Sequence, residues 1–384
     1  MIYLLIEFID ELVFGINEAA WPLIRNDLHL NYIQIGLALS LPGFVANFIE
    51  PFIFTLGDVW KRRVIILTGG IFFTLALLFT GISPSFIFLL LSFILFNPSS
   101  GAYIGLSQAN LMDNDPDRRE NNMARWTFAG SLGVVIGPIL LACAAYIGFG
   151  WRGMFILLML LSTLILLFAF KQIPHDKPDL VSLPQFTEVL NQFWLTLRGL
   201  RNWSIVRWLI LLEFSDLMLD IFYGFLPLYF VDVAHFTPAL AALSVAVWTG
   251  IGLLGDFLLI PLVERVKGLD YLRVSVVIEL ILFPLFLLVS LSWLKLVIIG
   301  LMGFFNAGWY AILKAKLFES MHGQSGAAQA LDNVAGMFGK LIPFTIGLAA
   351  QAFGLAGAMW LLLAGPIALL VGLPRKVEWK SDEL

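Results

Sequence analysis

Long apolar runs recur along the sequence, and they constrain the fold more than any other feature. The stretch 153–170, for example, contains no charged side chain. A helix needs about 20 apolar residues to cross the hydrocarbon core of a bilayer. Twelve segments reach that length, and charged clusters or Gly, Pro and Ser separate them. We expect spans at about 2–24, 32–56, 64–82, 85–111, 122–147, 152–171, 203–231, 238–263, 271–291, 293–317, 326–352 and 356–373.

The composition excludes other protein classes. Hydrophobic residues make up 60% of the 384 residues and charged residues 13%, whereas soluble domains carry about 25% charged residues. Disorder, an ordinary soluble enzyme and a nucleic-acid-binding surface are therefore excluded. A β-barrel would alternate in polarity over roughly ten-residue segments, and unbroken apolar runs such as 153–170 do not show that pattern. The single cysteine, Cys143, rules out a disulfide framework and a multi-cysteine metal site. We predict an all-α membrane protein with no cofactor and no metal site.

One polar segment divides the spans into two sets of six. It covers 172–202 and contains Pro174, Pro178 and Pro184 together with several charges. We predict an N-terminal six-helix bundle at 1–171, a cytoplasmic linker at 172–202, a C-terminal six-helix bundle at 203–373 and a cytoplasmic tail at 374–384.

The Lys and Arg residues between the spans predict the orientation. With a cytoplasmic N-terminus, sixteen of them fall in inside loops, and only Arg25, Arg152 and Lys295 fall in outside loops. Cytoplasmic loops carry an excess of such residues. We expect a multi-pass protein of the cytoplasmic (inner) membrane with both termini in the cytoplasm.

The two halves are related by an internal repeat. At an offset of 206 residues, five acidic positions of the first half meet acidic positions of the second, where about one match is expected by chance. The pairs are Glu7 with Glu213, Asp10 with Asp216, Glu50 with Asp256, Asp58 with Glu264, and Asp113 with Glu319. Six spans map onto six in the same orientation, which predicts a parallel repeat about an axis normal to the membrane.

These features, with the loop Gly57-Asp58-Val59-Trp60-Lys61-Arg62-Arg63, resemble the major facilitator superfamily. The loop is similar to the acidic and basic signature between helices 2 and 3 of that family, although Val59 and Lys61 depart from it. Glu264-Arg265-Val266-Lys267-Gly268 is a second copy of the same element. The resemblance implies twelve helices in two bundles around a central cavity, with Asp58, Arg62, Arg63, Glu264 and Arg265 at a cytoplasmic gate.

The fifth span contains Gly133-Val134-Val135-Ile136-Gly137-Pro138. It is similar to the Gly-x-x-x-Gly-Pro element of proton-coupled antiporters in that superfamily, although Leu141 and Ala142 replace its trailing glycines. An antiporter-like helix with Gly133, Gly137 and Pro138 is one interpretation, and close packing of small residues is the other.

Charged side chains inside the spans are the candidate functional residues. A carboxylate in the hydrocarbon region costs on the order of 2.5–3.5 kcal/mol, so it is expected to face a cavity or a partner. The first and seventh spans each carry three acids at helical spacing, and the resemblance places both faces at the central cavity. The candidates are Glu7, Asp10, Glu11, Glu50, Arg125, Glu213, Asp216, Asp220, Tyr223, Asp256, Lys314 and Lys340.

Crowded carboxylates in a low dielectric resist ionising together and share protons. This favours proton-coupled transport, and an acidic cavity with aromatic residues also suits an organic cation. Simpler interpretations remain open: Glu7 can lie in the headgroup layer, and Lys340 with Asp332 can be a structural ion pair. Asp10 and Asp216 are the first candidates for proton exchange, and Glu11 and Asp220 come next.

The sequence therefore predicts a secondary transporter that works by alternating access, as a monomer in the lipid bilayer. Its partners are a small-molecule substrate and protons, and the leading hypothesis is efflux of an amphipathic or cationic compound. Alternatives are a proton symporter that imports an anionic metabolite through Lys314, Lys340 and Arg125, a lipid or divalent-metal transporter, and a channel or receptor. No phosphate-binding loop or hydrolase motif is present, so we expect neither an ATP-driven pump nor an enzyme.

Overall fold

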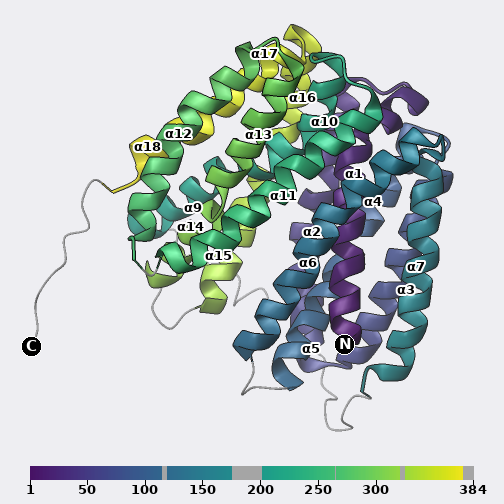
Figure 1. The fold of residues 1–384 in the computed structure, drawn as a ribbon. Coiled ribbons are helices and arrows are strands. Elements are labelled where there is room, and N and C mark those ends of the chain that lie inside the picture. The colour runs from purple at the N-terminus through teal and green to yellow at the C-terminus, as the bar shows by residue number, and fades with distance from the viewer. Residues whose placement is uncertain (115–118, 175–200, 264, 321–324, 375–384) are drawn as a thin grey trace, which may run out of the picture.

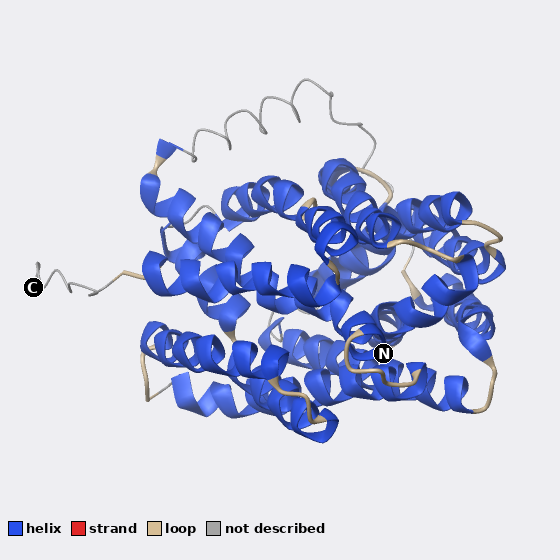
Figure 2. Ribbon diagram, turned by 90° about the horizontal axis from the view of Figure 1, so that it is seen from above, coloured by secondary structure: helices blue, strands red, loops and turns tan. Residues whose placement is uncertain are grey.

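The computed structural model describes residues 1–114, 119–174, 201–263, 265–320 and 325–374. Within these ranges the chain forms helices and loops and no strands, as Figure 2 shows from above. Most of the predicted linker (175–200) and tail (375–384) lie outside the described residues, so the proposed domain boundaries remain a prediction.

Six helical stretches form each half, and this confirms the predicted two-bundle fold. In the first half they are α1 (Ile2–Leu28), α2 (Tyr32–Val59), α3 (Arg62–Ile82), α4 (Phe86–Ser100) continued by the π-helix η1 (Gly101–Gly105) and α5 (Leu106–Asn114), α6 (Arg119–Tyr146) and α7 (Gly150–Gln172). In the second half they are α9 (Trp203–Asp216) continued by the π-helix η4 (Leu217–Ile221) and α10 (Phe222–Asp232), α11 (Pro238–Val263), α12 (Gly268–Leu288), α13 (Ser292–Asn306) with α14 (Trp309–Ser320), α15 (Ser325–Gly339) with α16 (Ile342–Phe353), and α17 (Leu355–Met359) with η5 (Trp360–Leu363) and α18 (Ala364–Gly372).

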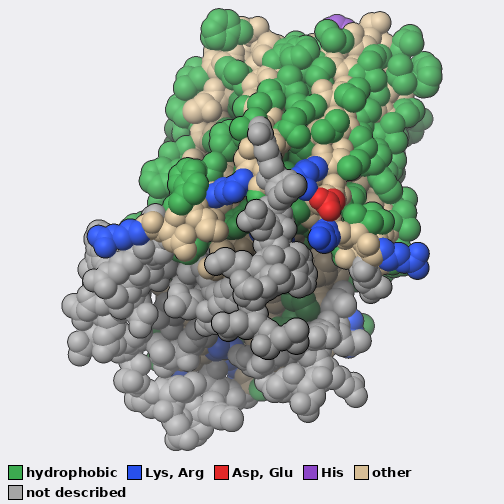
Figure 3. All heavy atoms as spheres, turned by 90° about the vertical axis from the view of Figure 1, so that its left-hand side faces the viewer, with side chains coloured by type: hydrophobic (Ala, Val, Ile, Leu, Met, Phe, Trp, Pro, Cys, Tyr) green, Lys and Arg blue, Asp and Glu red, His purple; other side chains and the backbone are tan. Residues whose placement is uncertain are grey.

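Ten of these stretches, searched over the described residues, are long and apolar enough to cross a membrane. The two stretches beyond those ten are α1 and α9–α10. Each carries an acidic trio: Glu7, Asp10 and Glu11 on α1, and Glu213, Asp216 and Asp220 on α9–η4. Lipid contacts the outside of the molecule, so apolar side chains cover both its surface and its interior. Figure 3 shows this as a broad band of hydrophobic side chains, with Lys and Arg side chains along its lower edge.

The two bundles touch at one end and diverge at the other (Figure 1). We call the end where α1 begins the open end, and the end where α1 finishes and α2 starts the closed end. At the closed end α2 and α16 touch backbone to backbone. A Cβ built on Gly36 would lie 2.7 Å from the carbonyl oxygen of Pro343, and one on Gly347 would lie 2.4 Å from that of Tyr32.

Connections at the closed end are short. Three residues join α1 to α2, α3 to α4, α6 to α7 and α12 to α13, and five residues join α10 to α11. Some of these turns need backbone conformations that few residues adopt, since His29 and His235 both have positive φ.

Helix distortions concentrate in the spans that face the other bundle. The π-helices η1 and η4 interrupt the fourth and seventh spans, and breaks interrupt the tenth span at Ala307–Gly308 and the eleventh at Lys340–Leu341. Gly308 has a φ of +73°, which a residue with a Cβ rarely adopts. Distorted helices at membrane depth occur where the backbone lines a cavity or is buried in protein, and these distortions lie beside the candidate site.

Candidate functional site

Two cavities lie between the bundles and extend toward the open end. One has a volume of about 710 Å³ and includes Glu11, Glu213 and Asp216 in its wall. The other has a volume of about 560 Å³ and includes Glu7 and Asp256. Of the described residues that line them, seven are carboxylates and one is a lysine: Glu7, Glu11, Glu213, Asp216, Asp220, Asp256, Asp332 and Lys340. The interior between the bundles is therefore strongly acidic.

A smaller cavity of about 170 Å³ lies on the closed-end side of this acidic space. Its polar residues include Asn17, Glu18, Asp220 and Lys340, and aromatic rings such as Phe14 complete its wall. Three acidic residues, Glu18, Asp216 and Asp220, thus share this small compartment with Lys340.

Glu7 and Glu213 correspond in the internal repeat, and each lies against a glycine that also corresponds, Gly130 and Gly336. Glu7 lies beside Gly130, where a built Cβ would be 2.6 Å from Oε1, and Glu213 lies beside Gly336 and Gly339. The absence of a side chain at these glycines makes room for the carboxylates between the helices. Glu7 is buried between the helices, and its depth in the membrane remains a prediction.

A second repeat-related pair faces the distortions of the fourth and tenth spans. The Glu50 carboxylate lies beside Gly101 in η1, where a built Cβ would be 2.5 Å from Oε1. The backbone amide of Gly308 donates a hydrogen bond to Asp256 Oδ1 over 3.0 Å. Each carboxylate thus lies where the helix backbone departs from regular geometry.

The adjacent acids Asp10 and Glu11 on α1 face different neighbours. Ser100 Oγ donates a hydrogen bond of 2.8 Å to Asp10 Oδ1, so Asp10 faces α4 and is absent from the described lining of the two large cavities. Glu11, one residue further along α1, lines both cavities instead. A turn of about 100° per residue explains the difference, because only one of two adjacent side chains can face the opposite bundle.

Two lysines hold the acids of the second bundle. Lys314 forms an ion pair with Asp332, and Lys340 Nζ lies 3.6 Å from Asp220 Oδ2. The structural ion pair considered for Lys340 and Asp332 is therefore wrong, because eight residues of helix separate them by about 12 Å. Each finds its partner on another span. Arg125 is exposed on α6 and is not among the described residues that line the cavities.

The glycines of the antiporter-like helix pack against α1. A Cβ built on Gly133 would lie 2.7 Å from the backbone nitrogen of Leu12, and one on Gly137 would lie 2.9 Å from that of Ile16. A Cβ on Gly15 would in turn lie 3.0 Å from Pro138 Cδ. Their geometry is that of close helix packing.

The predicted gate residues are only partly described. Arg62 Nε donates a hydrogen bond to the carbonyl oxygen of Gly57, and Arg63 donates one of 2.6 Å to that of Phe170. Arg265 is exposed. Glu264 and the side chain of Asp58 fall outside what the structure describes.

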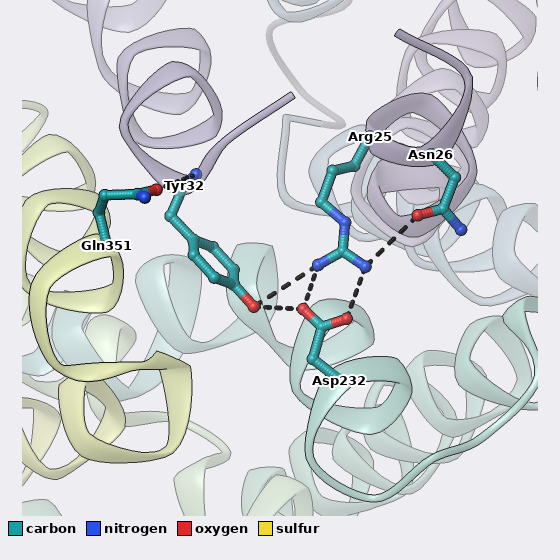
Figure 4. Close-up of polar contacts among 5 residues, drawn as sticks. All are labelled: Arg25, Asn26, Tyr32, Asp232 and Gln351. Carbon is teal, nitrogen blue, oxygen red and sulfur yellow. Dashed lines mark hydrogen bonds and ion pairs between the residues drawn. The ribbon is translucent and has the colours of Figure 1, made fainter. Parts of the chain in front are cut away.

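The closed end carries a polar cluster that the sequence reasoning missed. Arg25 at the end of α1 forms an ion pair with Asp232 at the end of α10, and the Tyr32 hydroxyl donates to the same carboxylate (Figure 4). The backbone nitrogen of Tyr32 also donates to Gln351 Oε1 over 3.2 Å. We call Arg25, Tyr32 and Asp232 the latch, because they join the two bundles. Its sequence signal was the pair of opposite charges near the outer ends of the first and seventh spans.

Aromatic and acidic side chains continue this closure toward the cavities. The rings of Phe14 and Tyr223 stack across the two bundles, with centroids 5.6 Å apart. A Cβ built on Gly224 would lie 3.1 Å from Glu18 Oε2, so α1 and α10 approach closely there. These contacts lie between the two large cavities and the closed end.

Another basic residue lies elsewhere than expected. Lys295, predicted in an outside loop, is 4% exposed within α13. Its Nζ donates to Tyr229 Oη over 2.8 Å and to the carbonyl oxygen of Phe286. These partners replace water, which explains how a lysine is buried one turn inside a helix.

Comparisons with known proteins agree with this architecture. Residues 3–342 match the family model described as Major Facilitator Superfamily. The crystal structure of the nucleoside transporter NupG aligns with a TM-score of 0.75 at 13% identity, covering 97% of this chain and 96% of that chain. A bacterial homologue of the human lysosomal transporter Spinster, in an inward-facing and unoccupied conformation, aligns with a TM-score of 0.71 at 18% identity, covering 97% of this chain and 92% of that chain. No curated protein matches the chain by sequence.

Proposed function

The chain belongs to the Major Facilitator Superfamily, whose members are secondary transporters and not enzymes, and from this premise we propose that it exchanges protons for a small organic cation. The excess of carboxylates over lysines in the two large cavities carries the proposal. Carboxylates away from bulk water favour either a bound proton or a bound cation, because an uncompensated negative charge there is costly. Aromatic rings such as Tyr310 in the same wall suit an amphipathic cation.

Competition for the same carboxylates makes the transport an exchange. A cation that binds at Asp216 or Asp220 displaces protons from the acidic site, and a proton that returns displaces the cation. A ligand shifts an equilibrium only through its differential binding to two states. Each passage between the open and closed arrangements therefore carries one ligand or the other, which is the condition for coupled antiport.

The distribution of basic residues supports a direction for this exchange. Lys and Arg side chains gather at the edge of the apolar band nearer the open end (Figure 3), and such residues favour the cytoplasm. The open end is then cytoplasmic and the closed end external. Protons entering from outside drive the cation outward, so we propose efflux through a monomer of the cytoplasmic membrane, with both termini inside.

The experiment uses purified full-length protein and a panel of organic cations, including ethidium, and organic anions. Ligands are first scored by thermal stabilisation at two pH values, since a ligand of the folded protein raises its apparent stability. We expect cations to stabilise more strongly at the higher pH, where fewer protons compete. Stabilisation by anions that grows at the lower pH would instead support proton symport.

Transport of the selected cation is then measured in proteoliposomes that contain a pH-sensitive dye. We expect cation movement to be accompanied by opposite proton movement, and Asp216→Asn to abolish that proton movement. Glu319→Gln is the matched control, because Glu319 is exposed and paired with Lys316 on its own helix. Unchanged coupling in Asp216→Asn contradicts the proposal.

A further inference from the structure

One buried carboxylate lies outside the acidic cavities and has no counter-charge among the residues that the structure describes. Glu279 on α12 is 0% exposed, and neither of its carboxylate oxygens has a hydrogen-bond partner among the described residues. At the repeat offset of 206, the corresponding residue of the first bundle is Phe73, which packs against the rings of Phe96 and Tyr103. Glu279 is therefore an acid at a position that the other bundle fills with an apolar side chain.

Charged side chains on the elements packed against α12 are committed elsewhere. Backbone contacts bring α13, α14, α18 and η5 against α12, and the last two contain no charged residue. Rings of α10 also pack on α12, and the charged residue of α10, Asp232, is paired with Arg25. Lys295 of α13 binds Tyr229 and Phe286, Lys314 of α14 binds Asp332, Lys316 binds Glu319, and Arg273 of α12 itself binds Asp270 and Pro374. A buried carboxylate without a partner is far less costly when it carries a proton than when it is ionised.

Asn306 connects this carboxylate to the transport pathway. Its amide lies near enough to interact with the Glu279 carboxylate, although not in the geometry of a regular hydrogen bond. Asn306 is 4% exposed, and its Oδ1 also has no hydrogen-bond partner among the described residues. Asn306 lines the 560 Å³ cavity at the break between α13 and α14. Its Nδ2 donates over 3.3 Å to the carbonyl oxygen of Met218 in η4, between Asp216 and Asp220.

We propose that Glu279 is a second proton-binding residue, which takes a proton from the cavity past Asn306 and returns it there. The proton forms the carboxylic O–H of Glu279 while the second bundle holds the arrangement seen here. A change at the α13–α14 break admits water to the carboxylate and releases the proton. This proposal deepens the proton-coupled exchange proposed above and rests on it for its role in transport, although proton binding itself can be tested separately.

Proton binding is tested by infrared spectroscopy on the full-length protein. We expect the wild type to show the carbonyl stretch of a protonated carboxylic acid, and Glu279→Gln to lack that component. Asp270→Asn is the control, since Asp270 is on the same helix, exposed and paired with Arg273. A spectrum that Glu279→Gln leaves unchanged overturns the proposal, whatever the transport assays show.

The role in coupling is tested with the cation selected above. An imposed gradient of one pH unit supports about tenfold accumulation for each proton exchanged, because the proton concentrations on the two sides then differ tenfold. We expect Glu279→Gln to retain exchange of labelled for unlabelled cation and to lose about tenfold in gradient-driven accumulation. Undiminished accumulation in this variant limits Glu279 to a structural role and overturns the proposal. If the wild type shows no coupled exchange, the function proposed above fails, while the infrared result still decides proton binding.

Discussion

The acids of this protein differ in the kind of partner that each one has. Asp10 accepts a hydrogen bond from Ser100, Asp220 faces a lysine across 3.6 Å, and Glu279 has neither among the described residues. Glycines decide part of this pattern, because Gly130 and Gly339 leave the space that Glu7 and Glu213 occupy. At the scale of single residues, a missing side chain is as important to the acidic interior as a charged one.

Close approach at Gly133 gives a prediction of stability. Gly133→Ala puts a Cβ 2.7 Å from backbone atoms of α1, which cannot move aside as a side-chain end can. Overpacking of this kind costs typically about 1–3 kcal/mol, so we expect a lower melting temperature in detergent. Gly250→Ala is the control, since its Cβ would meet only Val135 Cγ1 at 3.7 Å. Equal melting temperatures for the two variants would contradict this account of the packing between α1 and α6.

Gly339 offers the opposite case, in which the neighbour is flexible. A Cβ at this position would lie 1.6 Å from Glu213 Oε2, and the carboxylate can rotate away. We expect Gly339→Ala to fold with little loss of stability and to transport poorly, because Glu213 leaves its position in the cavity wall. Melting temperature and transport rate are measured on the same preparation. A variant with normal transport shows that the position of Glu213 does not matter.

At the scale of elements, the ends of α1 and α10 hold the bundles together at the closed end. The Arg25–Asp232 ion pair is partly buried, with side chains 17% and 19% exposed, so solvent screens it only in part. We assign it about 1 kcal/mol. The same end has a second ion pair, Arg152 with Asp27 at 2.7 Å, which lies within the first bundle. Only the first pair must break for the bundles to separate there.

The latch therefore controls access from the closed end. The reporter is Ala38→Cys in the small cavity on the closed-end side, introduced into a chain whose single cysteine is replaced by Cys143→Ser. We expect Asp232→Asn to increase labelling by an impermeant maleimide about fivefold, as a loss of 1 kcal/mol allows. Asp27→Asn in the same background should leave the rate unchanged. Similar labelling of both variants would mean that the latch does not hold the bundles together.

The whole molecule has two bundles with unequal internal structure. Among the described residues, the first bundle has one interrupted span, at η1, while the second has η4, η5 and the breaks at 307–308 and 340–341. Asp220 lies in η4 and Lys340 at the 340–341 break, so movement at these interruptions changes the cavity wall directly. Alternating access requires that the contacts at the closed end open as those at the open end form.

A reversible cross-link between the bundles tests this requirement. Tyr32→Cys and Gln351→Cys, combined in the Cys143→Ser chain, place thiols on α2 and α16 where the two residues are in contact. We expect a short dithiol cross-linker to stop transport and a reductant to restore it, since the closed end must separate in every cycle. Each single-cysteine variant controls for loss of the native side chain. Full transport in the cross-linked double variant rules out rocking of the bundles about this end.

Apolar runs predicted the helices, because the length and composition of each run are local properties of the sequence. The 206-residue repeat predicted that the helices form two bundles, because it relates six spans to six others. The direction in which each acidic side chain points could not be predicted from the sequence. On α1, Glu11 lines the cavities and Asp10 contacts Ser100, and this depends on how the helix is rotated about its axis. Lys340 was assigned the wrong partner because residues eight apart share a helix face but lie about 12 Å apart along it, so each of the two pairs with a neighbouring span instead. The latch and the buried Lys295 each need contacts between distant segments, which one-dimensional spacing cannot supply.

The short connections at the closed end also limit what can recognise the protein from that side. Proteases cut most readily at exposed loop tips, and four of the turns there have only three residues. A hydrolase or binding protein that reaches this face meets almost no extended backbone. Compact turns thus leave little backbone accessible to other proteins at the same end where the latch holds the two bundles together.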